Sequence, residues 1–236
     1  MNNPDTLVAV SAYAGDIHQV EAFLPVYTHH ECPVVVLSPM DAPITRLSNP
    51  SIMCLMGGLR EWAGPKALAR QRKFLEILLQ FPAQRFLLND SDSFCLSAQL
   101  PKYLYDEPDT IWANIVPDLN PGLSHLPKVA LQPPYFLSRR NIEGMLRAAD
   151  NPPPSYYTLG DAVPIPTNCP DHWMLQVAHG SGFPYKTFPD GASFETQSAH
   201  GLNTMAEHVR RHGKNFIHSV KTGSVLARLQ LEYNAR

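Results

Sequence analysis

Residues 85–94 read Arg-Phe-Leu-Leu-Asn-Asp-Ser-Asp-Ser-Phe, a short apolar run that ends in two carboxylates, Asp90 and Asp92. The apolar run predicts a buried strand, which would deliver the pair to the end of a sheet. A divalent cation that carries a diphosphate requires such a patch of hard oxygen ligands. A calcium loop of the EF-hand type is excluded, because counting from Asp90 its turn glycine would fall on Cys95 and its terminal glutamate on Pro101.

The segment before this strand predicts a helix with a basic face. Residues 65–81 carry apolar side chains at helical spacing. Lys66 and Arg70 are four residues apart, so they share one face near the helix start. There they could neutralise a diphosphate beside Asp90 and Asp92. Aspartates after a strand are also typical of a simple turn or helix cap, so the pair has a purely structural explanation as well.

The first half of the chain alternates strands and helices. Buried strands are predicted at residues 6–12, 33–38 and 51–56. A helix is predicted from Ile17 to about Leu24, where Pro25 would limit or kink it. This alternation predicts an α/β fold, with a mostly parallel central sheet flanked by helices. Ligands of such sheets bind beyond the carboxyl ends of the strands, so we expect residues 11–16 and 90–92 to line one crevice.

The order of strand, helix, strand, basic helix and strand ending in Asp-x-Asp resembles the GT-A (Rossmann-like) fold of nucleotide-sugar-dependent glycosyltransferases. Residues 215–221, Asn-Phe-Ile-His-Ser-Val-Lys, resemble the closing element of that family. The resemblance implies that Asp92 and His218 are ligands of Mn²⁺ or Mg²⁺, with Asp90 contacting the metal or the ribose. It also implies that Lys221 contacts the diphosphate. It covers most of the chain in the order of elements, but its motifs are short.

Three residues that follow the first strand are candidates for binding the donor nucleotide. Ala12 and Tyr13 could contact the base, Tyr13 by stacking on it. Asp16 could accept a hydrogen bond from the ribose or from a ring N–H, although it could equally be the N-cap of the next helix. Ser91, between the two carboxylates, belongs to the same set. The glycine patterns of dinucleotide dehydrogenases and P-loop kinases are absent from the sequence, which disfavours both classes.

The rest of the chain is expected to form the acceptor half. A strand is predicted at 110–116, a short strand at 135–138, and a helix at 139–149 that Ser138 can cap. Residues 117–134 between the strands are rich in Pro and Gly. Residues 150–170 are rich in proline and are expected at the mouth of the acceptor site, or as a rigid surface connection.

Asp171 stands just before a predicted helix. In inverting enzymes of the family a carboxylate at this place acts as the general base on the acceptor hydroxyl. The resemblance therefore implies Asp171 as the base, with His172 beside it as a backup or an orienting group. Pro170 replaces the acidic residue that usually comes before the base, and an N-cap would explain Asp171 equally well.

The C-terminal segment is basic. Residues 200–236 carry six Lys or Arg against two Glu, although the whole chain has a net charge of −2. A helix is predicted at 204–212, a strand at 215–220 and a final helix at 225–233. The basic side chains could form a solvated helix face, or they could attract a diphosphate or a nucleic-acid backbone.

Length and composition favour one globular domain. The chain has 236 residues, of which 44% are hydrophobic and 17% charged. Residues 1–92 would be the nucleotide-sugar half and 93–236 the acceptor half. The absence of a signal peptide and of an apolar run of ~20 residues predicts a cytoplasmic protein without a membrane partner. The four cysteines have no metal or disulfide spacing, so we expect reduced thiols.

Together these features predict a metal-dependent, inverting glycosyltransferase that uses a nucleoside-diphosphate sugar, by default a UDP-sugar. The compact size and the basic C-terminal segment are compatible with small virus-encoded glycosyltransferases that modify hydroxymethylated pyrimidines in DNA. DNA is therefore the first acceptor to consider. A saccharide, a small molecule or a protein remains an alternative acceptor. Two other classes stay open. A nucleotidyltransferase would be expected to show a glycine-rich phosphate loop after the first strand, and the third class is a nucleotide-sugar-binding protein without activity.

Overall fold

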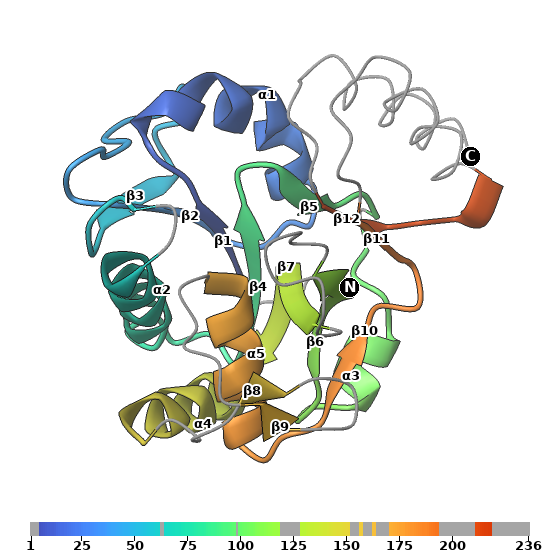
Figure 1. The fold of residues 1–236 in the computed structure, drawn as a ribbon. Coiled ribbons are helices and arrows are strands. Elements are labelled where there is room, and N and C mark those ends of the chain that lie inside the picture. Colours follow the sequence, from blue (N-terminus) through green and yellow to red (C-terminus); the bar gives the residue numbers. More distant parts are fainter. Residues whose placement is uncertain are drawn as a thin grey trace.

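The computed structural model describes residues 5–61, 64–97, 99–118, 128–151, 156–157, 162–163, 170–193 and 211–218. Its central feature is a seven-stranded sheet with the order β10-β6-β7-β4-β1-β2-β3 (Figure 1). The strands of this sheet are β1 (Thr6–Ser11), β2 (Val34–Ser38), β3 (Met53–Met56), β4 (Arg85–Asp90), β6 (Ile111–Asp118), β7 (Lys128–Ser138) and β10 (Tyr185–Thr187). Only β7 runs antiparallel to its neighbours in this sheet. The predicted α/β fold with a mostly parallel sheet is confirmed.

Two smaller sheets accompany the central one. The first has the order β11-β12-β5, and its strands are β5 (Ser93–Cys95), β11 (Gly191–Ser193) and β12 (Phe216–His218). The second pairs β8 (Tyr156–Tyr157) with β9 (Ala162–Val163). The first of these sheets matters for the site, because β5 begins just after the Asp-x-Asp.

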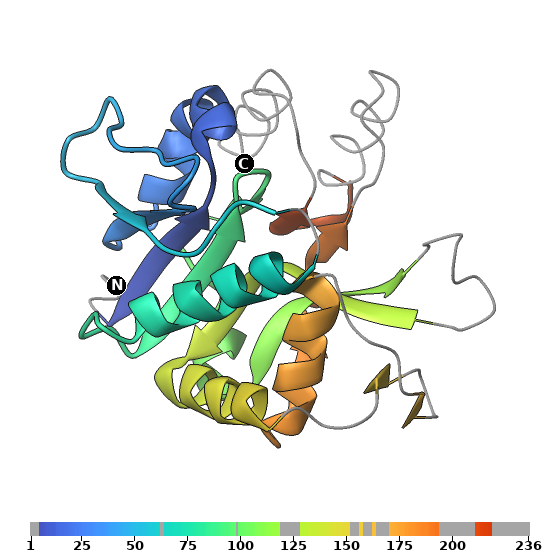
Figure 2. The same ribbon diagram turned by 60° about the vertical axis from the view of Figure 1, so that its left-hand side comes forward.

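Helices cover both faces of the central sheet. The helices α2 (Pro65–Leu78), α4 (Arg139–Asp150) and α5 (Pro170–Gly180) lie on one face (Figure 2). The helix α1 (Ile17–Thr28), the short α3 (Tyr103–Asp106) and the small sheet of β5 and β12 lie on the other. Successive residues of β1 alternate between the two cores, with Leu7 in one and Val8 in the other. A strand that is buried on both faces reads as a continuous apolar run, which is how the sequence identified β1, β2 and β4.

Several predicted boundaries were wrong. The first helix continues past Leu24 to Thr28 with Pro25 inside it, because the side chain of Pro25 is exposed and the following turn still closes from the His29 N–H to the Pro25 carbonyl. The strands predicted at 110–116 and 135–138 are longer than expected. The pair β6–β7 reaches Asp118 on one strand and Lys128 on the other, and it includes Pro117, Pro133 and Pro134.

Some elements were missed and some predictions fall outside the described residues. The strands β5, β10 and β11 are each three residues long, too short for a periodic pattern, whereas β12 lies within the strand predicted at 215–220. Predicted elements at 204–210 and 219–233 lie outside the described residues. The described cysteines Cys32, Cys54 and Cys95 are free thiols, as predicted, and Cys169 lies outside. Among the described helices, none is long and apolar enough to cross a bilayer.

The start of α4 is capped and anchored. The Asn141 N–H donates to Ser138 Oγ, and Asn141 Oδ1 accepts from the Ser138 N–H, which confirms Ser138 as the cap. The next residue, Arg139, donates to the backbone carbonyls of Leu79, Phe81 and Ala83. One guanidinium therefore satisfies the carbonyls that follow α2 and ties α2 to α4.

We expect Arg139→Met to lower the free energy of unfolding by about 2–3 kcal/mol, because it leaves several partly buried carbonyls without a donor. The matched control is Arg140→Met in the same helix, whose side chain is 69% exposed and pairs with Asp109. That change should cost less than about 1 kcal/mol, as for other surface ion pairs. Urea unfolding followed by circular dichroism measures both, and equal losses would contradict the anchoring role.

Candidate metal centre

The Asp-x-Asp lies at the carboxyl end of β4, in the middle of the sheet. Asp90 is the last residue of the strand and stands opposite Ser11, the last residue of β1. Ser91 Oγ donates to Asp16 Oδ2 over 3.0 Å. The segments that follow β1 and β4 therefore line one crevice, as the strand order in the sequence predicted.

The turn between β4 and β5 is held from both sides. The Asp90 N–H donates to Ser93 Oγ over 2.7 Å. The buried phenol of Tyr27 on α1 lies 3.3 Å from the carbonyls of Asp90, Ser91 and Ser93. Gln19 of the same helix donates to the Ser91 carbonyl over 2.8 Å. These hydrogen bonds fix the backbone of the turn, which carries the side chains of Asp90 and Asp92.

The third member of the centre comes from the far end of the chain. The strand β12 pairs antiparallel with β5, which places His218 opposite Ser93. His218 Nε2 lies 3.8 Å from Asp92 Oδ1. One ligand atom each from Asp90, Asp92 and His218 lies within 4.8 Å of the others, so the three residues form a group that could hold a metal ion.

The donor set fits a divalent cation. Two carboxylate oxygens and one imidazole nitrogen are ligands that Mn²⁺ accepts, while Mg²⁺ prefers oxygen ligands and water. All three residues are partly buried. They are the group of possible ligands found among the described residues, and three protein ligands leave coordination positions for water or a substrate.

The charges around Asp90 are unevenly balanced. Burial raises the pKa of the Asp90 carboxyl group well above its ordinary value, and the negative charges of Asp92 and Asp171 raise it further. Arg70 acts in the opposite direction, and burial lowers the pKa of the Arg70 guanidinium. The excess of negative charge in a half-buried crevice favours a bound cation.

Asp171 is one of the charged residues that influence the pKa of Asp90. It lies in the first turn of α5, because the helix begins at Pro170 and not after Asp171 as predicted. Asp171 Oδ1 is 3.3 Å from the hydroxyl of Tyr135, whose oxygen also lies 2.8 Å from the Leu131 carbonyl. The phenol of β7 thus fixes the direction of the carboxylate. His172 is half-buried beside it on α5.

Asp16 and Tyr13 lie on the other side of the crevice. Asp16 occupies the N-cap position of α1, but its side chain makes no capping bond, so the capping prediction was wrong. Its Oδ2 accepts from Ser91 Oγ and, at 3.4 Å, from the Tyr13 N–H. Burial raises the pKa of Asp16, and these hydrogen bonds oppose the rise. The ring of Tyr13 packs over Gly15, with the Arg60 guanidinium 4.0 Å from its centroid.

The other candidates are placed as follows. Ala12 is buried and donates its N–H to the Leu37 carbonyl over 3.0 Å. Arg70 donates to the Glu61 carbonyl over 3.1 Å and is close enough to Asp90 to influence its charge. The side chain of Lys66 is exposed and makes no contact with the carboxylates within the described part of the chain. Lys221 lies outside the described residues.

Sequence reasoning missed the supporting residues. Gln19 and Tyr27 on α1, Gln132 and Tyr135 on β7, and Arg60 after β3 all contact members of the site. Nothing in their spacing marks them, because each meets its partner only through packing between distant segments. Gln132 additionally lies in a part of β7 for which the sequence predicted no strand.

No protein-family model matches the sequence, and no curated protein matches it either. The chemistry of the centre must therefore be argued from the geometry of its own residues.

We expect Mn²⁺ to raise the melting temperature of the parent protein, because an ion that binds only the folded state stabilises it by mass action. Asp92→Asn and His218→Gln should each abolish most of this rise, since each removes one ligand while keeping the side-chain size. Asp109→Asn is the control, because Asp109 pairs with Arg140 on the surface. A full Mn²⁺ response in Asp92→Asn would contradict the site.

Proposed function

We propose that this protein is a metal-dependent glycosyltransferase of the GT-A type that transfers a sugar from a nucleoside-diphosphate donor. The observation that carries the proposal is the convergence of Asp90, Asp92 and His218 at the carboxyl end of β4. Arg70 and Asp171 lie within electrostatic reach of the same carboxylate. A centre of two carboxylates and an imidazole, flanked by a cation and a further carboxylate, suits the departure of a diphosphate and the activation of a hydroxyl.

The donor half of the site uses residues after β1, β3 and β4. A bound Mn²⁺ or Mg²⁺ would supply positive charge to the diphosphate that leaves as the anomeric bond breaks. Arg70, whose half-buried guanidinium is costly to desolvate, would stabilise the same charge. Asp16, held by Ser91, would accept a hydrogen bond from the ribose or base. The ring of Tyr13 would stack on the base, by default uracil, once Arg60 moves off it.

The acceptor half centres on Asp171. In an inverting transfer a carboxylate accepts the proton of the acceptor hydroxyl as that oxygen attacks the anomeric carbon from the side opposite the diphosphate. The Tyr135 hydroxyl lies 3.3 Å from one oxygen of Asp171. The charge of Asp171 also reaches the metal centre, since it helps to raise the pKa of the Asp90 carboxyl group.

The donor assignment is tested by titrating UDP, GDP, CDP and ADP into the protein with and without Mn²⁺, followed by assays of hydrolysis of the matching sugar donors. We expect one diphosphate to bind only with the metal, and its sugar donor to be hydrolysed slowly. Release of pyrophosphate from a triphosphate would instead indicate a nucleotidyltransferase. Binding without hydrolysis or transfer would indicate a binding protein.

Asp171→Asn should leave donor and Mn²⁺ affinity nearly unchanged and lower the transfer rate by about 10²–10⁴, the usual contribution of general-base catalysis. The amide keeps the size of the side chain and can still accept from Tyr135. Single-turnover rates with saturating donor measure the effect. Undiminished transfer would leave Asp171 with a purely structural role at the start of α5.

DNA that contains hydroxymethylated pyrimidines is the first acceptor to test. Arg211 and Lys214, just before β12, are the described cations of the basic C-terminal segment. If they contact phosphates, Arg211→Gln with Lys214→Gln should weaken DNA binding and reduce the slope of log K against log salt by about 0.9 for each lost contact. Donor affinity should not change. An acceptor affinity that is independent of salt would point to a saccharide or small-molecule acceptor.

A further inference from the structure

The imidazole of His218 contacts a residue that is not itself a metal ligand. His218 Nδ1 lies 3.1 Å from Gln132 Oε1, while Nε2 faces Asp92 at 3.8 Å. Both His218 and Gln132 are half-buried. The two ring nitrogens thus face different partners, and the partner of one nitrogen decides what the other can do.

A carbonyl oxygen can only accept, so the proton of a neutral imidazole belongs on Nδ1 in this contact. Nε2 then presents a lone pair to the space shared with Asp90 and Asp92. Asp92 Oδ1 lies 3.8 Å from Nε2, so in this tautomer the lone pair is on the side of the ring that faces a carboxylate.

The backbone around Gln132 is fixed to the strand that carries the imidazole. Asn114 of β6 stands opposite Gln132 in the β6–β7 register, and its buried amide donates to the Pro133 carbonyl over 3.2 Å. Asn114 also packs so closely on Gly191 of β11 that no Cβ fits there. The strand β11 pairs with β12, and in this pair Ser193 of β11 stands opposite His218 of β12.

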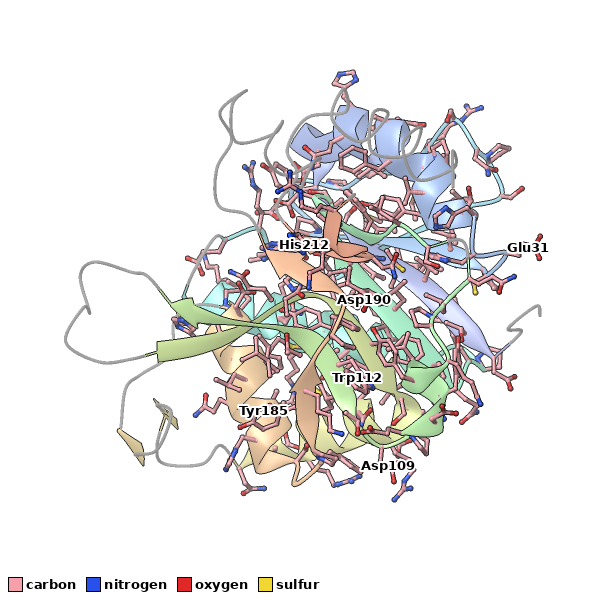
Figure 3. The ribbon with its side chains drawn as sticks, turned by 90° about the vertical axis from the view of Figure 1, so that its right-hand side faces the viewer. Glu31, Asp109, Trp112, Tyr185, Asp190 and His212 are labelled. Carbon is pink, nitrogen blue, oxygen red and sulfur yellow. The ribbon has the colours of Figure 1, made fainter. Side chains whose placement is uncertain are left out.

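Further hydrogen bonds join the start of β12 to Asp190, the residue just before β11. Asp190 accepts from the backbone N–H of Asn215 and of Phe216, over 2.8 and 3.2 Å, and from the hydroxyl of Tyr103. Figure 3 labels Asp190 and Trp112 on the side of the molecule that faces the viewer, and in the same region β11 contacts β6 and β12 contacts β7. Gln132 on β7 and His218 on β12 are therefore carried by two strands that pack against each other.

We propose that Gln132 is a positioning residue for His218: its amide oxygen holds the Nδ1–H tautomer and so directs the Nε2 lone pair to the metal. This inference rests on the proposed metal site. Partners of this kind, bonded to the second nitrogen of a histidine ligand, set its orientation and typically change metal affinity by about 10–100-fold.

The first test needs no metal. Nitrogen chemical shifts of the metal-free protein at a pH of about 8, where an ordinary imidazole is neutral, report which ring nitrogen carries the proton. The His218 signals are identified by their absence from His218→Gln. We expect Nδ1–H in the parent and in Gln80→Leu, a matched change on the exposed end of α2. We expect a mixture of tautomers in Gln132→Leu, and an Nε2–H tautomer in the parent would overturn the proposal.

The second test measures Mn²⁺ affinity by calorimetry. Gln132→Leu should bind Mn²⁺ about 10–100-fold more weakly than the parent, while Gln132→Glu, which keeps an acceptor for Nδ1–H, should stay within a few-fold. Melting temperatures of the metal-free variants show that folding is intact, and Gln132→Glu carries the test if Gln132→Leu is unstable. A parent that binds no Mn²⁺ would sink the proposed metal function. Equal Mn²⁺ affinity in Gln132→Leu and the parent would overturn the role of Gln132 alone.

Discussion

The pairing of β12 with β5 is the contact on which the candidate centre depends. The strand β5 starts one residue after Asp92, so whatever pairs with it is placed beside the carboxylates. The pair itself is short and gains its stability from packing. Phe216 is fully buried and stacks on Phe188 with ring centroids 3.9 Å apart. A few buried aromatic contacts thus determine where an imidazole meets two aspartates.

The crevice concentrates charge at a cost in stability. Asp16 and Asp90 both have a raised pKa because burial disfavours their charged form, and the neighbouring carboxylates add repulsion. The surrounding residues compensate by binding the backbone. Tyr27 and Gln19 satisfy the carbonyls of the turn, and Ser93 receives the Asp90 N–H. These bonds hold the backbone that carries Asp90 and Asp92.

The two sides of the centre are built by different means. One side uses residues at the carboxyl ends of parallel strands, where Ser11 and Asp90 stand in register. The other side uses α5 and the antiparallel β7, which bring Asp171 to 3.3 Å from the hydroxyl of Tyr135. The single reversed strand of the sheet thus presents side chains to the crevice from a direction that the parallel strands cannot reach. Gln132 and Tyr135 both come from this strand.

The sequence by itself determined β1, β2, α2 and β4, and the place of Asp90 and Asp92 at a strand end. Continuous apolar runs and helical spacing are local signals, and the edge of a parallel sheet at which ligands bind follows from chain direction. The sequence also predicted a strand at 215–220, and the resemblance to the closing element drew attention to His218 within it.

Only the tertiary structure decided what stands next to these residues. The strands β5 and β12 are three residues long and carry no period, so their pairing follows from burial of Phe94 and Phe216 against distant segments. Whether Asp16 caps a helix or binds Ser91 depends on a competition between a local and a long-range hydrogen bond, and the long-range bond prevailed. Contacts of this kind depend on the three-dimensional arrangement of distant segments, which no local pattern encodes.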